Sequence, residues 1–186
     1  MQYRNPDIES SYRENDIGRT LYDLVLRLKP EKIVEFGILY GYSTVAMAMA
    51  LDELGSGHIR AYDLFEDYPF KHGSMEGVAE AVRGYGLSKY VTLEKKNFDD
   101  WLAAPEPFDL LHVDVSNKGD TITRLYESVS ERIAQGAAVI FEGGSEERDN
   151  VEWMIKYNAT KINDSGVPFK VIDSRFPSLS MLVSRE

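Results

Sequence analysis

Two glycines follow an apolar run near the N-terminus, with an acid just before them and a hydroxyl just after them. Glu35 precedes Gly37, and Gly41 precedes Ser43. Gly37 allows the backbone to turn sharply, and Gly41 allows a ligand or a helix to approach the backbone closely. A hydroxyl and free N–H groups at the start of a helix can cap that helix or hold a polar ligand. The spacing fits a ligand-binding loop, and it also fits a plain turn between a strand and a helix.

The next apolar run, residues 58–63, also ends in an acid. A carboxylate at the end of the second strand, here Asp63, typically binds the ribose hydroxyls of a nucleoside ligand. The glycine loop lacks the G-x-G-x-x-G spacing that cradles a dinucleotide pyrophosphate. Glu35 at the start of that loop disfavours a polyphosphate and suits a ligand that carries positive charge. Together these residues predict a site for a cationic ligand of the nucleoside type.

The sequence that must position these residues alternates between two periods. Short apolar runs typical of buried strands stand at 33–36, 58–63, 90–94, 108–114, 137–141, 169–172 and 180–183. Segments with helical spacing of apolar residues stand at 17–28, 43–54, 75–82, 122–133 and 151–155. This alternation predicts an α/β fold with a mostly parallel sheet and helices on both faces, whose ligands bind at the C-terminal ends of the strands. Because no helix separates the last two strands, they should form an antiparallel hairpin.

Length, composition and charge limit the classes of function. The chain has 186 residues, no cysteine and a net charge of −10. A single core typically runs to about 100–200 residues, so we expect one domain over residues 1–186, with an N-terminal leader and helix over 1–30. We expect no membrane span and no signal peptide, hence a cytoplasmic protein. The acidic charge and the lack of a Lys and Arg cluster argue against a nucleic-acid partner, and the lack of cysteine excludes a thiolate metal site.

Residues 35–43 carry the pattern E-x-G-x-x-x-G-x-S, which resembles the first motif of the class I S-adenosylmethionine-dependent methyltransferases. The match is to the small-molecule O-methyltransferase branch, which is catechol O-methyltransferase-like or methyltransferase-24-like. Residues 108–114 are similar to that family's fourth strand, F-D-x-x-x-x-D, and residues 135–140 to the entry of its fifth. The resemblance covers essentially the whole chain. It implies a Rossmann-like, doubly wound, mostly parallel seven-stranded sheet with a C-terminal antiparallel hairpin strand.

The resemblance also implies a cofactor, S-adenosyl-L-methionine, and a set of residues that bind it. This set is Glu35, Gly37, Gly41, Ser43, Asp63, Asn97, Phe98 and Asp114. Glu35 and Gly37 would lie near the methionine part, with Ser43 near its carboxylate. Asp63 would bind the ribose hydroxyls, and Asp114 would lie near the sulfonium and the acceptor. Residues 97–99 would border the adenine or, alternatively, only begin a short helix.

Methyl transfer to a hydroxyl requires that the acceptor's proton be handled, by a general base or by a divalent ion. The family that the chain resembles holds a metal with an acid after the fourth strand and an Asp-Asn pair after the fifth. Asp114 matches the first acid, and Glu142 could replace the second, but Gly143 has no amide side chain. A Mg²⁺ ion held by Asp114, Glu142 and water is therefore one prediction, and metal-free transfer is the other.

Without a metal, the candidates for the general base are Asp114, Glu142, Lys118 and His72. The family's basic residue just past the fourth strand has no matched counterpart, although Asn117 or Lys118 falls nearby. We therefore assign the catalytic role to the group Asp114, Glu142, Asn117 and Lys118. His112 shares a sheet face with Asp114, and we expect it to be a core residue.

These observations predict a methyltransferase that acts on a hydroxyl of a small-molecule acceptor. Residues 143–149 resemble a stretch in methyltransferase-like proteins linked to sugar or polysaccharide biosynthesis, which implies a sugar or polysaccharide precursor. Residues 65–73 and 142–153 both follow strand ends and could line the acceptor pocket. A homodimer could complete that pocket. Two alternatives stay open: a non-catalytic member of the fold that binds the cofactor or a partner, and a nucleotide-linked Rossmann oxidoreductase.

Overall fold

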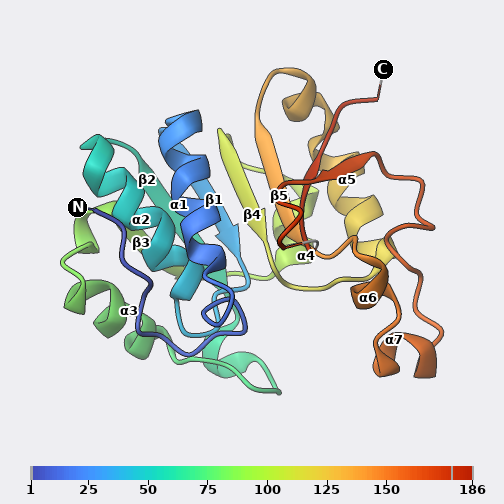
Figure 1. Ribbon diagram of the computed structural model, residues 1–186, viewed down its shortest axis with the longest axis horizontal. Helices are drawn as coiled ribbons and strands as arrows, with labels where there is room; N and C mark the ends of the chain where they lie inside the picture. Colours follow the sequence, from blue (N-terminus) through green and yellow to red (C-terminus); the bar gives the residue numbers. More distant parts are fainter. Residues whose placement is uncertain (1, 177, 186) are drawn as a thin grey trace. The chain divides into compact units, whose positions relative to one another are not determined.

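The computed structural model describes residues 2–176 and 178–185, and the chain folds into two compact units (Figure 1). The first unit is Met1–Phe98 and the second is Asp99–Glu186. Strands and helices alternate in both units, as the two periods of the sequence predict. Every helix among the described residues is too short or too polar to span a membrane.

The sheet of the first unit consists of three parallel strands in the order β3-β2-β1. The strands are β1 (Lys32–Phe36), β2 (His58–Asp63) and β3 (Val91–Lys95). The helices are α1 (Ile17–Leu28), α2 (Tyr42–Leu54) and α3 (Met75–Gly84), with the 3-10 helices η1 (Phe65–Asp67) and η2 (Ser88–Tyr90). Helix α1 packs on α2, and α2 packs on β2.

Helices α1 and α2 illustrate two ways in which sequence determines burial. The buried residues of α1 recur at helical spacing and form one face: Ile17, Gly18, Leu21, Tyr22, Leu24 and Val25. Lys29, directly before Pro30, caps the C-terminal end of this helix. Its backbone is left-handed, and its N–H donates to the Val25 carbonyl. Helix α2 is buried all round from Tyr42 to Leu51, because its sequence is small and apolar throughout, so it lies inside the unit.

In the second unit the strands follow the order β4-β5-β7-β6. They are β4 (Leu110–Val113), β5 (Ala138–Glu142), β6 (Phe169–Val171) and β7 (Leu179–Leu182). The helices are α4 (Phe98–Ala103), which begins at the boundary, α5 (Gly119–Ala134), α6 (Glu146–Asp149) and α7 (Glu152–Lys156). Strand β5 runs parallel to β4 and antiparallel to β7, which in turn is antiparallel to β6. This unit therefore has one reversed strand beside an edge.

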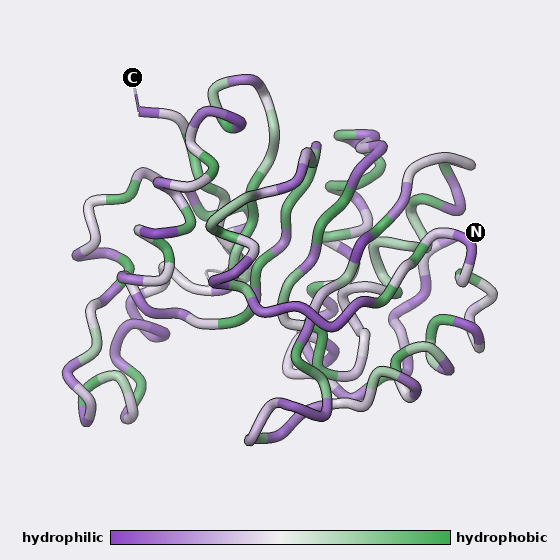
Figure 2. Tube along the Cα trace, turned by 180° about the vertical axis from the view of Figure 1, so that it is seen from behind, coloured by the Kyte–Doolittle hydropathy of each residue, from purple (hydrophilic) through white to green (hydrophobic). Residues whose placement is uncertain are grey.

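The described residues confirm the predicted fold class, a Rossmann-like, mostly parallel sheet of seven strands with an antiparallel C-terminal hairpin. Hydrophobic residues follow the strands, and hydrophilic residues gather in the loops (Figure 2). Some predicted bounds were wrong. The strand expected at 108–114 spans only Leu110–Val113. The helix expected at 151–155 is present as α7, and a separate helix, α6, precedes it. Ser145 begins α6 because its hydroxyl accepts the N–H of Arg148.

Candidate active site

The glycine loop after β1 bends through three residues with left-handed backbones. Gly37 has φ 86°, Leu39 has φ 52° and Gly41 has φ 90°. The Gly41 N–H closes the turn on the Ile38 carbonyl at 2.8 Å, and a Cβ on Gly41 would stand 3.0 Å from Cγ1 of Val78. Because a side chain at either glycine would be strained, both glycines are required by the loop itself. Leu39 takes the same conformation at a cost, a kind of strain that clusters at functional sites.

Glu35 is fully buried at the end of β1 and holds the start of helix α2. Its two carboxylate oxygens accept hydrogen bonds from the hydroxyls of Ser43 and Thr44, each at 2.5 Å. Both residues predicted to lie near the methionine part of the cofactor, Glu35 and Ser43, thus bind each other across the glycine loop. Sequence reasoning missed Thr44, although a second hydroxyl beside Ser43 was a signal for such a pair.

Asp63 at the end of β2 ties that strand to the glycine loop. One carboxylate oxygen accepts the N–H of Ile38 at 2.7 Å, and the other accepts the N–H of Phe65 at 3.0 Å. A carboxylate oxygen has two lone pairs, so each oxygen keeps one for a further donor. The acid predicted to bind the ribose is therefore fixed in orientation, beside the loop, with acceptor capacity left over.

Residues 97–99 lie between β3 and the helix that follows it. Asn97 is exposed directly after β3, and Phe98 begins helix α4, so the expected short helix is present, and a place beside an adenine stays a prediction. The Phe98 ring lies edge-on to the Phe36 ring, with their centroids 5.1 Å apart. Phe98 is thereby held against the end of β1, and its half-buried ring leaves part of its surface for a ligand.

The segment between β2 and α3 lies against the glycine loop. A Cβ on Gly73 would stand only 2.0 Å from the Leu39 carbonyl oxygen, so the two backbones are in direct contact there. Tyr68 and Phe70 in this segment are exposed, and their rings pack edge to face at 5.5 Å. The predicted acceptor-lining stretch 65–73 thus presents an aromatic pair beside the loop.

In the second unit, the candidates after β4 differ sharply in exposure. Asp114 is half-buried, Asn117 is buried, and Lys118 is exposed. The amide of Asn117 donates to the Arg148 carbonyl at 3.4 Å, and Nζ of Lys118 lies 5.8 Å from the centre of the Trp153 ring. These contacts bring the segment after β4 together with the segment after β5. The expected core residue His112 is indeed fully buried in β4.

Glu142 ends β5 and is buried, with 8% of its surface exposed. Its Oε2 accepts a hydrogen bond from Nη2 of Arg148 at 2.6 Å, while Oε1 accepts none from the described residues. Burial raises the pKa of Glu142, and the charges of Arg148 and His112 oppose that rise. Arg148, six residues further on in α6, was not among the predicted catalytic residues. The sequence signal that could have found Arg148 is its position in the first turn of a helix that follows the acid at the end of β5.

The turn after Glu142 consists of two glycines, and side chains from later segments lie close to both. Gly143 has φ 133° and Gly144 has φ 87°. A Cβ on Gly143 would stand 2.5 Å from Cδ1 of Ile162, and one on Gly144 would stand 2.6 Å from the Phe169 ring. The side chain of Ile162 therefore fills the space into which an amide side chain at position 143 would project.

These surroundings do not fit the Mg²⁺ ion considered from the sequence. Mg²⁺ requires near-octahedral oxygen ligands, usually one or two carboxylates together with waters, and a guanidinium beside a ligand oxygen repels the ion. Of the two proposed ligands, Glu142 already pairs with Arg148, and Ile162 covers Gly143 where a third ligand would stand. Nor do the described residues contain any group of three His, Cys, Asp or Glu side chains placed to hold a metal.

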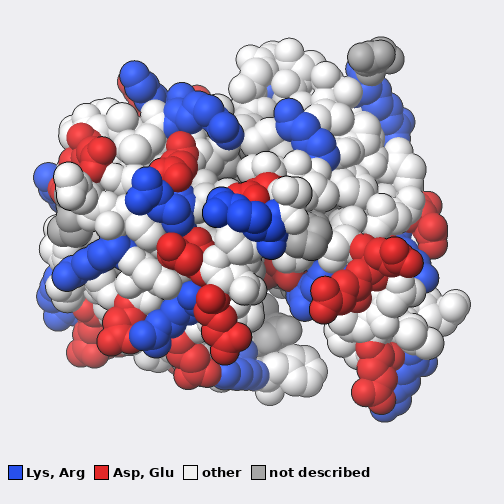
Figure 3. Space-filling model, in the orientation of Figure 1, with Lys and Arg blue, Asp and Glu red and all other residues white. Residues whose placement is uncertain are grey.

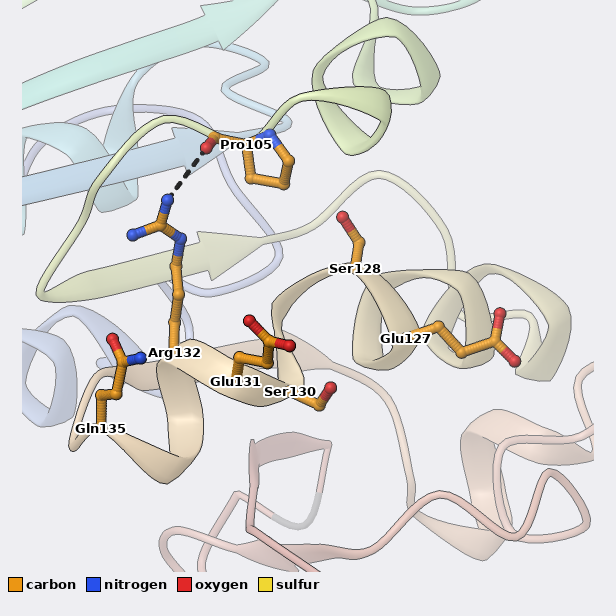
Figure 4. Close-up of a pocket in the computed structure, with 7 residues that line it drawn as sticks. All are labelled: Pro105, Glu127, Ser128, Ser130, Glu131, Arg132 and Gln135. Carbon is orange, nitrogen blue, oxygen red and sulfur yellow. Dashed lines mark hydrogen bonds between the residues drawn. The ribbon is translucent and has the colours of Figure 1, made fainter.

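A surface hollow of about 450 Å³ lies elsewhere on the second unit, along the C-terminal half of α5 (Figure 4). Its lining is Pro105, Glu127, Ser128, Ser130, Glu131, Arg132 and Gln135. The guanidinium of Arg132 crosses it to donate to the Pro105 carbonyl at 3.1 Å. None of the residues predicted from the sequence lines this hollow, so we give it no role in the candidate site.

Solved structures share the fold of this chain at low sequence identity. The O-methyltransferase TomG from Streptomyces achromogenes, solved with S-adenosylmethionine, is 17% identical with a TM-score of 0.60, over 97% of this chain and 83% of its own. An O-methyltransferase from Bacillus cereus, solved with S-adenosylhomocysteine, is 18% identical with a TM-score of 0.62, over 97% and 84%. A TDP-rhamnose 3′-O-methyltransferase of calicheamicin biosynthesis is 15% identical with a TM-score of 0.59, over 95% and 82%.

A search of curated proteins found no match. A family model described as a methyltransferase domain matches residues 34–142, which include the glycine loop, Asp63, Asp114 and Glu142. This match spans more than half of the chain and runs from β1 to the end of β5. The protein therefore belongs to this methyltransferase domain family.

Proposed function

We propose that the protein transfers a methyl group from S-adenosyl-L-methionine to a hydroxyl of a small molecule. The observation that carries the cofactor is the fixed carboxylate of Asp63, bound to the N–H of Ile38 in the glycine loop and open to further donors. Ribose hydroxyls are such donors. The comparisons support this choice, because TomG and the Bacillus cereus enzyme were solved with S-adenosylmethionine and S-adenosylhomocysteine.

When bound, the cofactor supplies a methyl group on a positively charged sulfur, and the acceptor oxygen forms a bond to that carbon as the carbon–sulfur bond breaks. The protein's part is to hold the acceptor in line and to remove its proton. The residues that we propose for holding the acceptor and removing its proton are Asp114, Asn117, Lys118 and Glu142. Because the donor set around Glu142 does not fit Mg²⁺, we propose that the reaction needs no divalent metal. Turnover that EDTA abolishes and Mg²⁺ restores would contradict this.

The acceptor that we propose is a hydroxylated small molecule such as a sugar or a polysaccharide precursor. Support comes from the TDP-rhamnose 3′-O-methyltransferase among the structural relatives and from the resemblance of residues 143–149. On the face shown in Figure 3, Lys and Arg side chains are interspersed with Asp and Glu, which disfavours a polyanionic partner. A single functional domain over residues 1–186, a cytoplasmic location and a homodimer stay predictions, and light scattering would measure the last.

Calorimetric titration with S-adenosylmethionine tests the cofactor half. We expect binding by the wild-type protein and about 10–100-fold weaker binding by Asp63→Asn, because a charge-assisted hydrogen bond is worth about 1.5–3 kcal/mol. Asp67→Asn is the matched control, since Asp67 follows the same strand but is exposed and pairs with Lys95. Absence of binding by the wild type would refute the proposal, and binding of NAD(P) instead would favour the oxidoreductase.

A methyl-transfer screen separates the enzyme from a non-catalytic binder. Hydroxylated acceptors, with free sugars and nucleotide sugars included, are incubated with S-adenosylmethionine labelled in its methyl group. Incorporation of label into a hydroxylated acceptor is the expected result. Tight cofactor binding with no incorporation into any acceptor would favour the non-catalytic alternative.

A further inference from the structure

The two oxygens of the Glu142 carboxylate have different surroundings. Oε2 accepts the hydrogen bond from Arg148, whereas Oε1 accepts none from the described residues and is not sealed from solvent. An arginine that only neutralises a buried carboxylate commonly binds both oxygens with two N–H groups. Here one oxygen of a buried carboxylate is left available at the C-terminal end of a sheet strand, which is where α/β proteins bind their ligands.

The backbone of Arg148 is held on both sides. Its backbone N–H donates to the Ser145 hydroxyl at 3.2 Å, and its carbonyl accepts the amide of Asn117 at 3.4 Å. Nε is buried with no hydrogen-bond partner in the described part of the chain, although 40% of the Arg148 side chain is exposed. A donor held in this way fixes the rotamer of the carboxylate that it binds.

The ion pair is not what holds this region together. Asp149, the residue after Arg148, is 2% exposed and accepts the backbone N–H groups of Ile162 and Asn163 at 3.1 and 3.0 Å. The amide of Asn163 donates to Asp149 at 2.8 Å and to the Gly144 carbonyl at 3.1 Å. Helix α6 is thus fastened to the following segment without Glu142, which frees the Glu142–Arg148 pair for another role.

We propose that Glu142 is the general base of a metal-independent methyl transfer, and that Arg148 is the positioning residue that orients it. This inference rests on the proposed function. Oε1 of Glu142 takes the proton of the acceptor hydroxyl as the acceptor oxygen bonds to the methyl carbon, and it later releases that proton to water. Arg148 stays protonated throughout and stabilises the ionised carboxylate, the charge state that a base requires.

The other three catalytic candidates of the second unit are less well placed. Lys118 is exposed, and its ammonium lies against the Trp153 ring. The amide of Asn117 is engaged by Arg148 and has no basic atom. Asp114 is half-buried, and it makes interactions of its own. Glu142 combines burial, a fixed orientation and an available oxygen.

The test combines a carboxylate titration with kinetics. Carbon-13 NMR of protein labelled at the glutamate carboxyl follows Glu142, whose signal is assigned by its loss in Glu142→Gln. The variants are Arg148→Met, Arg148→Lys and, for the histidine whose electrostatic interaction also lowers the pKa of Glu142, His112→Asn in β4. Arg124→Met is the matched control, because Arg124 forms an exposed ion pair with Asp99 in the same unit.

In Arg148→Met we expect the titration midpoint of Glu142 and the acid limb of kcat/KM to move together to higher pH. Arg148→Lys should restore part of the shift, and Arg124→Met should cause none. Glu142→Gln should lower kcat by about 10²–10⁴-fold, with the affinity for S-adenosylmethionine unchanged by calorimetry. A midpoint that Arg148→Met leaves in place, or a kcat that Glu142→Gln leaves intact, would overturn the inference. Failure of the wild type to bind the cofactor would instead overturn the proposed function.

Discussion

Strands β1 and β5 both end in a buried glutamate, yet the two carboxylates are treated differently. Glu35 is fully buried, and both of its oxygens accept a hydroxyl of helix α2. Glu142 has one bonded oxygen, one available oxygen and a cationic partner. The first carboxylate is satisfied by the fold, and the second is only half satisfied. Because the available oxygen of Glu142 makes no contribution to the fold of the described residues, its place at the end of β5 fits a use outside the fold.

Asp149 extends the same comparison within the second unit. It lies seven residues after Glu142, is more deeply buried, and accepts three hydrogen bonds from the segment at 162–163. Glu35 and Asp149 are therefore expected to matter for stability, and Glu142 for activity. Substitutions at the three positions can break or sharpen this division.

The largest effect is expected at the end of β1. Glu35→Ala leaves the Ser43 and Thr44 hydroxyls buried without their acceptor and opens a cavity, so we expect a loss of about 4 kcal/mol in the free energy of unfolding. Glu142→Ala should cost about 1 kcal/mol or less, because Arg148 is partly exposed and its guanidinium can turn to water. Urea unfolding followed by circular dichroism compares the two. Equal losses of unfolding free energy in Glu35→Ala and Glu142→Ala would contradict the division between a stabilising carboxylate and a functional one.

Asp149→Ala is expected to rank second, with a loss of about 3 kcal/mol, since it orphans one buried and one part-buried backbone N–H group. The affected donors belong to Ile162 and Asn163. Hydrogen exchange should therefore accelerate at these two amides more than in the first unit. The exposed neighbour Glu147→Ala is the control, and a similar loss of stability there would contradict the assignment.

Gly143→Ala is expected to cost about 2 kcal/mol, because the new Cβ meets both a left-handed backbone and Ile162. Gly136→Ala is the matched control: Gly136 also has a positive φ, of 99°, but has nothing within 4 Å of the new Cβ, so about 1 kcal/mol is expected. Ile162→Val should cost less in the Gly143→Ala background than alone, since it removes the Cδ1 atom. Full additivity in this double-mutant cycle would mean that the two side chains do not compete for the space.

Sequence reasoning reached the fold because the two hydrophobic periods are well separated along this chain. Strand-end acids could also be located, since β2 and β5 end at Asp63 and Glu142. What each acid binds could not be predicted. The partner of Glu142 is one of several charged residues in 146–149, and Arg148 reaches it after the turn at residues 143–144 and the start of α6 at Ser145. The bond from Glu35 to Ser43 likewise depends on the loop conformation rather than on local spacing.

The smallest effect concerns the pH dependence of stability. Burial raises the pKa of Glu142 above its ordinary value of 4.5, so the folded state holds this proton more tightly than the unfolded chain does. Stability contributed by the protonated group is therefore present below about pH 4.5 and is lost as the pH rises through the folded-state pKa. Glu142→Gln has no carboxyl to titrate at this position, so it does not lose this stability as the pH rises. Its stability relative to wild type should increase from pH 4 to pH 8 in urea unfolding, whereas Glu147→Gln gives the reference for losing one exposed charge. A difference between Glu142→Gln and wild type that is constant over this range would show that the carboxylate at β5 is as well satisfied as the one at β1.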